Sequence, residues 1–231
     1  LYFDSPRRNY VKLHKWTHAP SKAFTIAFWM KSSGRNPGTP FSYAVRGSDN
    51  ELLVYNYRGL ALYLKGKSLS LNMAPADGKW HHVAVTWRSS DGQIRSYLDG
   101  KIKRNGRFQR GQRIKNRGFL EIGQEQDRPG GGHDRGQAFH NGAISMLSVY
   151  NVAKSAKDVA KLMRRTISTS RHLLLGLNLN GNVQDASRFR TRVQIAGRPA
   201  PKFKPASVPG FGGKGKSVRK GGQTARALYF D

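Results

Sequence analysis

Apolar residues alternate with polar ones in short runs along the chain as far as residue 179, and Gly, Pro, Asn and Asp separate the runs. A period of two is typical of β-strands with one buried face. The pattern predicts strands at residues 1–13, 23–30, 41–45, 51–57, 60–64, 69–73, 80–87, 94–98, 118–122, 143–149 and 173–179, with a turn at 47–50. Many short strands joined by Gly-containing turns predict an all-β fold, an antiparallel jelly-roll β-sandwich.

One segment has a helical period instead. Residues 155–165 place Val159, Leu162 and Met163 on one face. Ser155 and Asp158 have the spacing of an N-terminal capping box, and basic residues follow at the end that the helix dipole makes negative. We therefore predict one short helix beside the sheets.

The C-terminal part has a different composition. Residues 188–227 hold eleven Lys or Arg and no acid, and Pro and Gly are frequent after Arg198, which is typical of a linker or an extended basic tail. The chain begins and ends with LYFD, at residues 1–4 and 228–231. A tandem array explains this repeat, and so does a cloning scar. We expect a domain at 1–200, a linker or arm at 201–227 and the start of a following repeat at 228–231, with residues 198–231 running onto a neighbouring copy.

Charge dominates the composition: 41 Lys and Arg stand against 13 Asp and Glu, a formal net charge of +28. Such a surface attracts polyanions. The basic residues expected to bind them are Lys101, Lys103, Arg104, Arg107, Arg110, Arg113, Lys115, Arg117, Lys214, Lys216, Arg219 and Lys220. Because no nucleic-acid-binding motif is present, nucleic acid is expected to bind only non-specifically. Anionic polysaccharide, acidic matrix or anionic mineral fits as well, and a merely solubilising charge is the alternative. No apolar run is long enough to predict a membrane span.

Acids are concentrated in one place. Residues 121–137 read EIGQEQDRPGGGHDRGQ, and three of the 13 acids of the chain lie between 125 and 134. Carboxylate and amide oxygens on a Gly-bent loop are the ligands that Ca²⁺ takes. The spacing does not match an EF-hand loop, and a solvated polar loop remains the alternative on spacing alone.

Several segments together resemble the pentraxin branch of the laminin-G, concanavalin A-like lectin superfamily. They are residues 22–29 (KAFTIAFW), 41–54 (FSYAVRGSDNELLV), 79–87 (KWHHVAVTW), 97–100 (YLDG) and 122–142 (IGQEQDRPGGGHDRGQAFHNG). The resemblance implies a flattened jelly roll with a helix on one face. It also implies two neighbouring Ca²⁺ ions on the other face, which capture phosphate or carbohydrate ligands.

The resemblance assigns the calcium ligands residue by residue. They are Asp49, Asn50, Glu125, the backbone carbonyl of Gln126, Asp127, Asp134 and Gln137. Asp134 stands where the family usually has Glu. The two cysteines of the usual pentraxin disulfide correspond to Ala27 and Ala84, which we expect to pack as a pair of methyl groups. Tyr63 and the neighbouring Lys67–Ser68 oppose a quaternary ammonium group, so specificity for phosphocholine is not expected.

Two other kinds of site are less well supported by the residues. Glucanases of the same superfamily use an E-x-D-x-x-E strand, whose carboxylates act as nucleophile and acid/base. Glu125 and Asp127 begin this pattern, but Gly130 stands where the third acid would be. His81 and His82 suggest a metal, yet they lie in a strand pattern beside Trp80, which favours a structural role.

The sequence thus predicts a non-enzymatic, secreted, calcium-binding lectin-like or matrix module. It is expected to bind polyanions and to assemble with other copies of itself as a tandem array or fibre. The alternatives are a ring-forming soluble pattern-recognition pentraxin and, with less support, a glycoside hydrolase.

Overall fold

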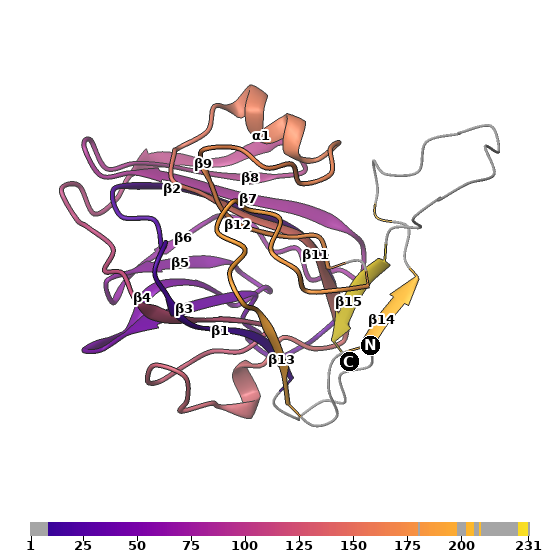
Figure 1. The fold of residues 1–231 in the computed structure, drawn as a ribbon. Helices are drawn as coiled ribbons and strands as arrows, with labels where there is room; N and C mark the ends of the chain where they lie inside the picture. Colours follow the sequence, from indigo (N-terminus) through magenta and orange to yellow (C-terminus); the bar gives the residue numbers. More distant parts are fainter. Residues whose placement is uncertain (1–8, 180, 198–201, 206–207, 209–225, 231) are drawn as a thin grey trace.

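Two antiparallel β-sheets packed face to face make up the fold (Figure 1). The structure, a computed structural model, describes residues 9–179, 181–197, 202–205, 208 and 226–230. Sheet A has the order β13-β1-β10-β3-β4-β5-β6, and sheet B has the order β14-β15-β11-β2-β7-β8-β9, with β12 pairing β11 off this path. This is the antiparallel sandwich that the alternating pattern predicts.

The strands of sheet A are β13 (Gln194–Ala196), β1 (Tyr10–Trp16), β10 (Gly118–Ile122), β3 (Phe41–Val45), β4 (Ser48–Tyr55), β5 (Ala61–Leu64) and β6 (Lys67–Ser70). Those of sheet B are β14 (Lys202–Pro205), β15 (Arg226–Phe230), β11 (Gly142–Tyr150), β2 (Ala23–Ser32), β7 (His81–Arg88), β8 (Gln93–Leu98), β9 (Lys101–Arg107) and β12 (Leu173–Leu177). None of the described helices has the length and hydrophobicity that crossing a membrane requires.

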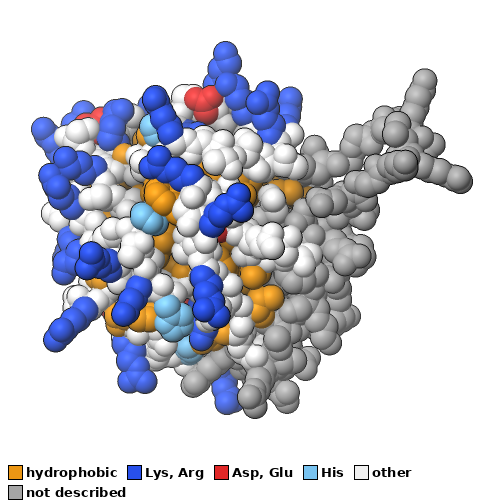
Figure 2. All heavy atoms as spheres, in the orientation of Figure 1, with side chains coloured by type: hydrophobic (Ala, Val, Ile, Leu, Met, Phe, Trp, Pro, Cys, Tyr) orange, Lys and Arg blue, Asp and Glu red, His pale blue; other side chains and the backbone are white. Residues whose placement is uncertain are grey.

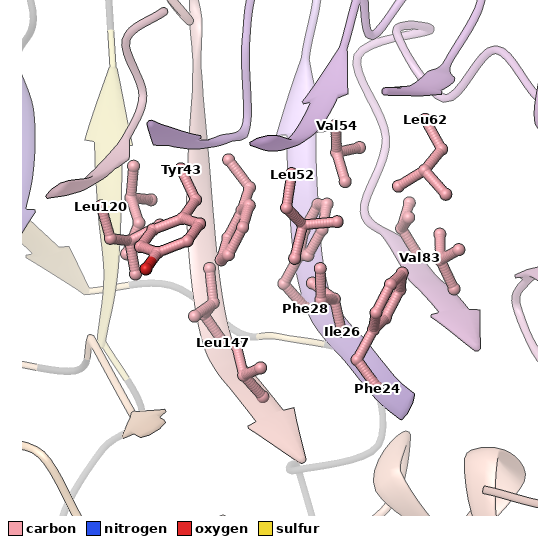
Figure 3. Close-up of a cluster of buried hydrophobic side chains, with 14 of the residues drawn as sticks. Phe24, Ile26, Phe28, Tyr43, Leu52, Val54, Leu62, Val83, Leu120 and Leu147 are labelled. Atoms are coloured by element: carbon pink, nitrogen blue, oxygen red, sulfur yellow. The ribbon is translucent and has the colours of Figure 1, made fainter. Parts of the chain in front are cut away.

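The core lies between the sheets, and β2 shows how the sequence fills it. Phe24, Ile26 and Phe28, at alternate positions, are fully buried among the side chains of sheet A (Figure 3). Leu52 and Val54 of β4 meet them from the opposite side. Because burial of one such side chain contributes about 1.5–3 kcal/mol, this alternation fixes which face of each strand points inward.

The helix α1 (Ala156–Leu162) covers the outer face of sheet B (Figure 1). Its Val159 is buried against Ala27 and Ala84, which lie directly opposite each other on β2 and β7. The predicted methyl pair is therefore confirmed. Ser155 caps the helix by accepting a hydrogen bond from the backbone N–H of Asp158 at 3.2 Å. The helix ends earlier than predicted, because the backbone N–H of residue 164 bonds three residues back rather than four.

The expected turn at residues 47–50 is wrong in its extent. Val45 pairs with Ser48 across a tight turn in which Gly47 has φ +79°, so residues 48–50 already belong to β4. This register matters for the site, since it places Asp49 and Asn50 on a strand rather than on a flexible loop.

Part of the C-terminal segment pairs with the chain's own sheet. β14 pairs antiparallel with β15, and β15 pairs with the Gly142–Ile144 part of β11. This differs from the expectation that residues 198–231 run onto a neighbouring copy. The free edge of β11 beyond its β12 pairing supplies the backbone groups that accept an added strand. The repeat at residues 1–4 and the basic residues Lys214, Lys216, Arg219 and Lys220 lie outside the described residues.

Candidate calcium site

The loop between β10 and β11 carries the acidic cluster. Its two ends are tied together, because the backbone N–H of Phe139 donates to the carbonyl of Gly123 at 2.9 Å and the Phe139 ring is buried. In between, the buried amide of Gln126 donates to the carbonyls of Ser42 at 2.9 Å and of Phe119 at 3.2 Å. These bonds hold the loop against β3 and β10.

Glycines let this loop turn back beside Asp127. The backbone groups of Arg128 and Gly131 bond each other reciprocally, at 3.2 and 2.9 Å. Gly132 has φ +73°, and a Cβ at this position would lie 2.7 Å from the Cβ of Asp127. The glycine run therefore supplies a conformation that other residues rarely adopt, and it removes a side chain that would collide with Asp127.

The carboxylates of the loop lie close to one another and to β4. Burial raises the pKa of Glu125 most, the charge of Asp127 and a hydrogen bond with it come next, and Asp49 adds a smaller increase, to a value of about 8. Burial also raises the pKa of Tyr55, helped by its neighbour Tyr63 and by the charges of Glu125 and Asp134. Carboxylates that raise one another's pKa in this way are stabilised by a cation between them.

Two of the ligand positions assigned by the resemblance have a buried oxygen without a hydrogen-bond partner: Oε2 of Glu125 and Oδ1 of Asn50. Both residues are among the seven calcium ligands that the pentraxin resemblance assigns. An unsatisfied buried acceptor costs about 1–3 kcal/mol, which coordination to a cation offsets. The residues present therefore fit a calcium ion.

Gln126 can bind a metal only through its backbone carbonyl, because its side chain is already engaged in hydrogen bonds. Its side-chain Nε2 is bonded to strand carbonyls, and its Oε1 accepts the N–H of Gly130 at 2.8 Å. The resemblance likewise assigns the carbonyl, not the amide, of Gln126. On β4, Asp49 accepts the backbone N–H of Asn50 at 3.0 Å and keeps its other oxygen for a ligand.

Asp134 and Gln137 bond each other in the second half of the loop. Asp134 caps the short helix η1 (Arg135–Gln137) by accepting the N–H of Gly136 at 2.8 Å, and it accepts from Nε2 of Gln137 at 3.3 Å. Within the part of the chain that the structure describes, no three carboxylates or imidazoles converge into a metal-binding cluster. The structure thus brings Glu125 and Asp127 together near Asp49, while the complete set of seven ligands stays a prediction.

Two tyrosines border the acidic cluster, and the sequence pattern had pointed to Tyr63 but not to Tyr55. The rings of Tyr55 and Tyr63 meet edge to face with centroids 6.0 Å apart. Tyr63 pairs across β5 and β6 with Ser68, next to the exposed Lys67. The sequence signal for this pair was the presence of an aromatic residue at an outward position on each strand of the hairpin at 51–64.

The basic residues at 101–117 lie on strand β9 and on the loop that follows it. Lys101, Lys103, Arg104 and Arg107 belong to β9, the edge strand of sheet B. Among the residues described, none of the eight predicted cations in this segment takes part in an ion pair. Lys and Arg are also spread widely over the face seen in Figure 2, with few acids among them.

The loop that follows β9 is firmly attached. The carbonyl of Phe108 accepts the indole N–H of Trp87 at 2.8 Å, and the carbonyl of Gln112 accepts the hydroxyl of Ser89 at 2.6 Å. Ile114 is buried in the core. Since these contacts use backbone groups and one apolar side chain, Arg110, Arg113, Lys115 and Arg117 stay exposed on a fixed loop.

The two histidines of β7 have structural contacts. His81 lies between Asp99, 2.7 Å from its Nδ1, and Asp77, 3.0 Å from its Nε2. Burial acts to lower the pKa of His81, but hydrogen bonds and charges of these two carboxylates outweigh it and raise the pKa. His82 is buried, and burial lowers its pKa to about 4, so the ring is neutral.

Comparison with known proteins gives the class of the molecule. The family model described as "Pentaxin family" matches residues 2–194. The chain belongs to the pentraxin family, whose members are non-enzymatic binding proteins with a concanavalin A-like lectin fold. Pentraxins generally bind calcium and assemble with copies of themselves.

The matches with curated relatives lie within this domain and span only a small part of the relatives' own length. The chain is 42% identical over 144 residues to the rat sushi, von Willebrand factor type A, EGF and pentraxin domain-containing protein 1, and 44% identical over 134 residues to rat neuronal pentraxin-1. These matches cover 61% and 56% of this chain but 4% and 30% of the relatives. The heptameric SAP-like pentraxin of Limulus polyphemus has a similar structure, with TM-score 0.60 and 23% identity over 83% of this chain and 87% of that one.

Proposed function

We propose that this domain is a secreted lectin-like module that binds a phosphate or carbohydrate ligand through calcium on the outer face of sheet A. The observation that carries the proposal is the buried, unpartnered Oε2 of Glu125 beside Asp127, together with the buried, unpartnered Oδ1 of Asn50 on β4. Family membership supports the same conclusion. A bound Ca²⁺ would supply positive charge and open coordination positions for ligand oxygens.

The protein's own residues set the scaffold of this site. Gln126 fixes the loop on β3 and β10, and Gly132 lets it pass Asp127. The charge of Asp49, on β4, acts on Glu125 of that loop. Tyr55 and Tyr63 add an apolar and hydrogen-bonding border, which suits a sugar ring better than a quaternary ammonium group because Lys67 lies next to them.

Capture on immobilised ligands tests the proposal. The protein is passed over phosphorylated and neutral saccharides in calcium and then in EDTA. We expect retention in calcium, release by EDTA and loss of retention in Asp127→Asn. The matched control is Asp91→Asn, which removes an exposed carboxylate on the β7–β8 turn and should retain the ligand. Retention that ignores EDTA, or that both variants lose equally, contradicts calcium-dependent binding.

We further propose that polyanions bind the basic surface of β9 and its following loop, apart from the calcium site. The exposed cations there have no acidic partner among the described residues, so their charge is available to a ligand. Anionic polysaccharide, acidic matrix and anionic mineral share the needed chemistry. Lys214, Lys216, Arg219 and Lys220 belong to the same proposal on sequence alone.

A charge-matched comparison tests the polyanion proposal. One variant changes four cations of the loop to Gln: Arg110, Arg113, Lys115 and Arg117. The control changes four exposed cations elsewhere to Gln: Arg46, Lys67, Lys79 and Lys157. If the loop is the site, the slope of log affinity for heparin against log salt falls by about three in the first variant only, by analogy with phosphate contacts to DNA. Equal losses in both variants would show diffuse charge instead.

The form of assembly is also a proposal. An array or fibre is the form that the sequence predicts, whereas a ring is the alternative that pentraxin membership supports. The pairing of β15 with the chain's own β11 counts against the array. The molar mass in solution, measured by light scattering, distinguishes the two. One discrete multiple of the chain favours the ring, and a continuous series of masses favours the array.

A further inference from the structure

A cavity lies between α1 and the outer face of sheet B. Its volume is about 180 Å³. Strands β7 and β11 contribute His82, Ser148 and Tyr150, the helix contributes Lys161, and the segment after it contributes Arg165. We call it the α1 pocket. An engineered cavity of about 150 Å³ takes one benzene molecule, so this space suits one small group and not a polymer chain.

Cations outnumber acids around the α1 pocket. Lys154, Lys161 and Arg165 line it together with one acid, Asp158. Asp158 is already engaged, because it accepts from Lys161 Nζ at 2.9 Å and from the Ser155 hydroxyl at 2.7 Å. The pocket therefore keeps an excess of positive charge without a carboxylate to balance it.

Lys154 is the cation that is most deeply placed. Its Nζ lies 4.1 Å from the centroid of the Tyr150 ring, and the side chain is half-buried. In the described part of the chain no carboxylate lies within ion-pairing distance of Lys154. An ammonium group that has lost part of its water gains more from an anion than an exposed lysine does.

Neutral hydrogen-bonding groups complete the wall. The hydroxyls of Thr166 and Ser168 can donate, and neither carries charge that would repel an anion, whereas the Ser148 hydroxyl already donates to the carbonyl of Ala27 at 3.4 Å. At the base, His82 is 2% exposed, and its Nδ1 has no hydrogen-bond partner. A buried nitrogen without a partner, in a chamber of cations and hydroxyls, is an observation independent of the charge count.

From this geometry we propose that the α1 pocket binds a single tetrahedral oxyanion, a phosphate or sulfate group, without calcium. Lys154 and Arg165 supply the charge, and the hydroxyls of Thr166 and Ser168 donate to its oxygens. The pocket lies apart from the calcium loop and from the β9 surface. It is also smaller than a polymer site, and it needs no metal.

Titration with inorganic phosphate and inorganic sulfate tests the proposal, in EDTA and at constant ionic strength. The readout is the backbone amide spectrum of the labelled protein. We expect saturable shifts near Tyr150 and Ser168 below about 50 mM anion, a weak affinity in the range of a lone small anion. Lys154→Met should weaken binding at least tenfold. Lys157→Met is the matched control, because Lys157 is an exposed lysine of α1, three residues further on, that does not line the pocket, and it should leave binding unchanged.

The arms of the titration separate the sources of the anion. Stronger shifts with a sugar phosphate or sugar sulfate than with the inorganic ion indicate a saccharide carrier, and equal shifts indicate the free ion; both support the oxyanion site. An unsubstituted sugar that gives the same shifts overturns the proposal. So does linear, unsaturated drift, or an equal loss in Lys154→Met and Lys157→Met. Because EDTA is present throughout, failure here leaves the calcium proposal untouched.

Discussion

A disulfide introduced between β2 and β7 tests the register on which the whole sandwich rests. Ala27 and Ala84 are direct partners in the antiparallel pairing of these strands, and both are buried. They occupy the positions that the pentraxin resemblance assigns to cysteines. The variant Ala27→Cys/Ala84→Cys should therefore close a bridge without a shift of the backbone.

The expected gain follows from the length of the loop that the bridge closes. A closed loop of about 58 residues removes enough unfolded-state entropy to raise the free energy of unfolding by about 4 kcal/mol. The sulfurs must fit beneath Val159 and beside Tyr97, which share the cluster with the two alanines. Crowding there subtracts from the gain, so we expect a net increase of about 2–4 kcal/mol for the oxidised protein.

Urea denaturation measures this gain with and without a reducing agent. The single variant Ala27→Cys carries part of the packing cost without the bridge, and it should be slightly less stable than the parent. The oxidised double variant should exceed its own reduced form by the entropic amount. If oxidation fails to form the bridge in the folded protein, or forms it without raising stability, the β2–β7 register is wrong.

Three further predictions concern other parts of the fold. Burial lowers the pKa of His82 from 6.5 to about 4, so the stability that the neutral ring contributes is complete above pH 6.5 and falls by about 3 kcal/mol as the pH drops toward 4. The variant His82→Gln should therefore flatten the plot of unfolding free energy, measured in urea, against pH over this range. An unchanged plot would contradict the buried neutral ring. Gly118→Ala should cost more than about 2 kcal/mol, because a Cβ there would lie 2.3 Å from a backbone carbonyl of β3; wild-type stability would show that the β3–β10 contact is looser. Ser155→Ala should cost about 1 kcal/mol by removing the cap of α1, and Ser155→Asp should restore it.

The sandwich could be predicted from the sequence because its signals are local. In β2 the alternation of Phe24, Ile26 and Phe28 with smaller or polar residues identifies both the strand and its inner face. The helix was equally visible from the spacing of Ser155 and Asp158. Other elements depend on distant partners. Strand β13 pairs with β1 from the far end of the chain, and its three residues have no pattern of their own.

The site was predictable in part for the same reason. Glu125 and Asp127 stand out by spacing and composition, but the position of Asp49 beside them depends on the register of three strands. The α1 pocket left no signal at all in the sequence. Its walls come from β7, β11, α1 and the segment after it, and only the folded chain brings Lys154 over Tyr150.

Calcium-dependent stability tests the central claim most directly. Thermal unfolding is followed in EDTA and at rising Ca²⁺, for the parent, for Asp127→Asn and for the control Asp91→Asn. A site that binds only the folded state adds about 2.7 kcal/mol at 100 times its Kd, which for a domain of this size raises the Tm by about 5–10 °C. We predict this rise for the parent and for Asp91→Asn and its loss in Asp127→Asn. A Tm that does not respond to millimolar Ca²⁺ in the parent, or that rises equally in all three proteins, would contradict a calcium site on the loop between β10 and β11.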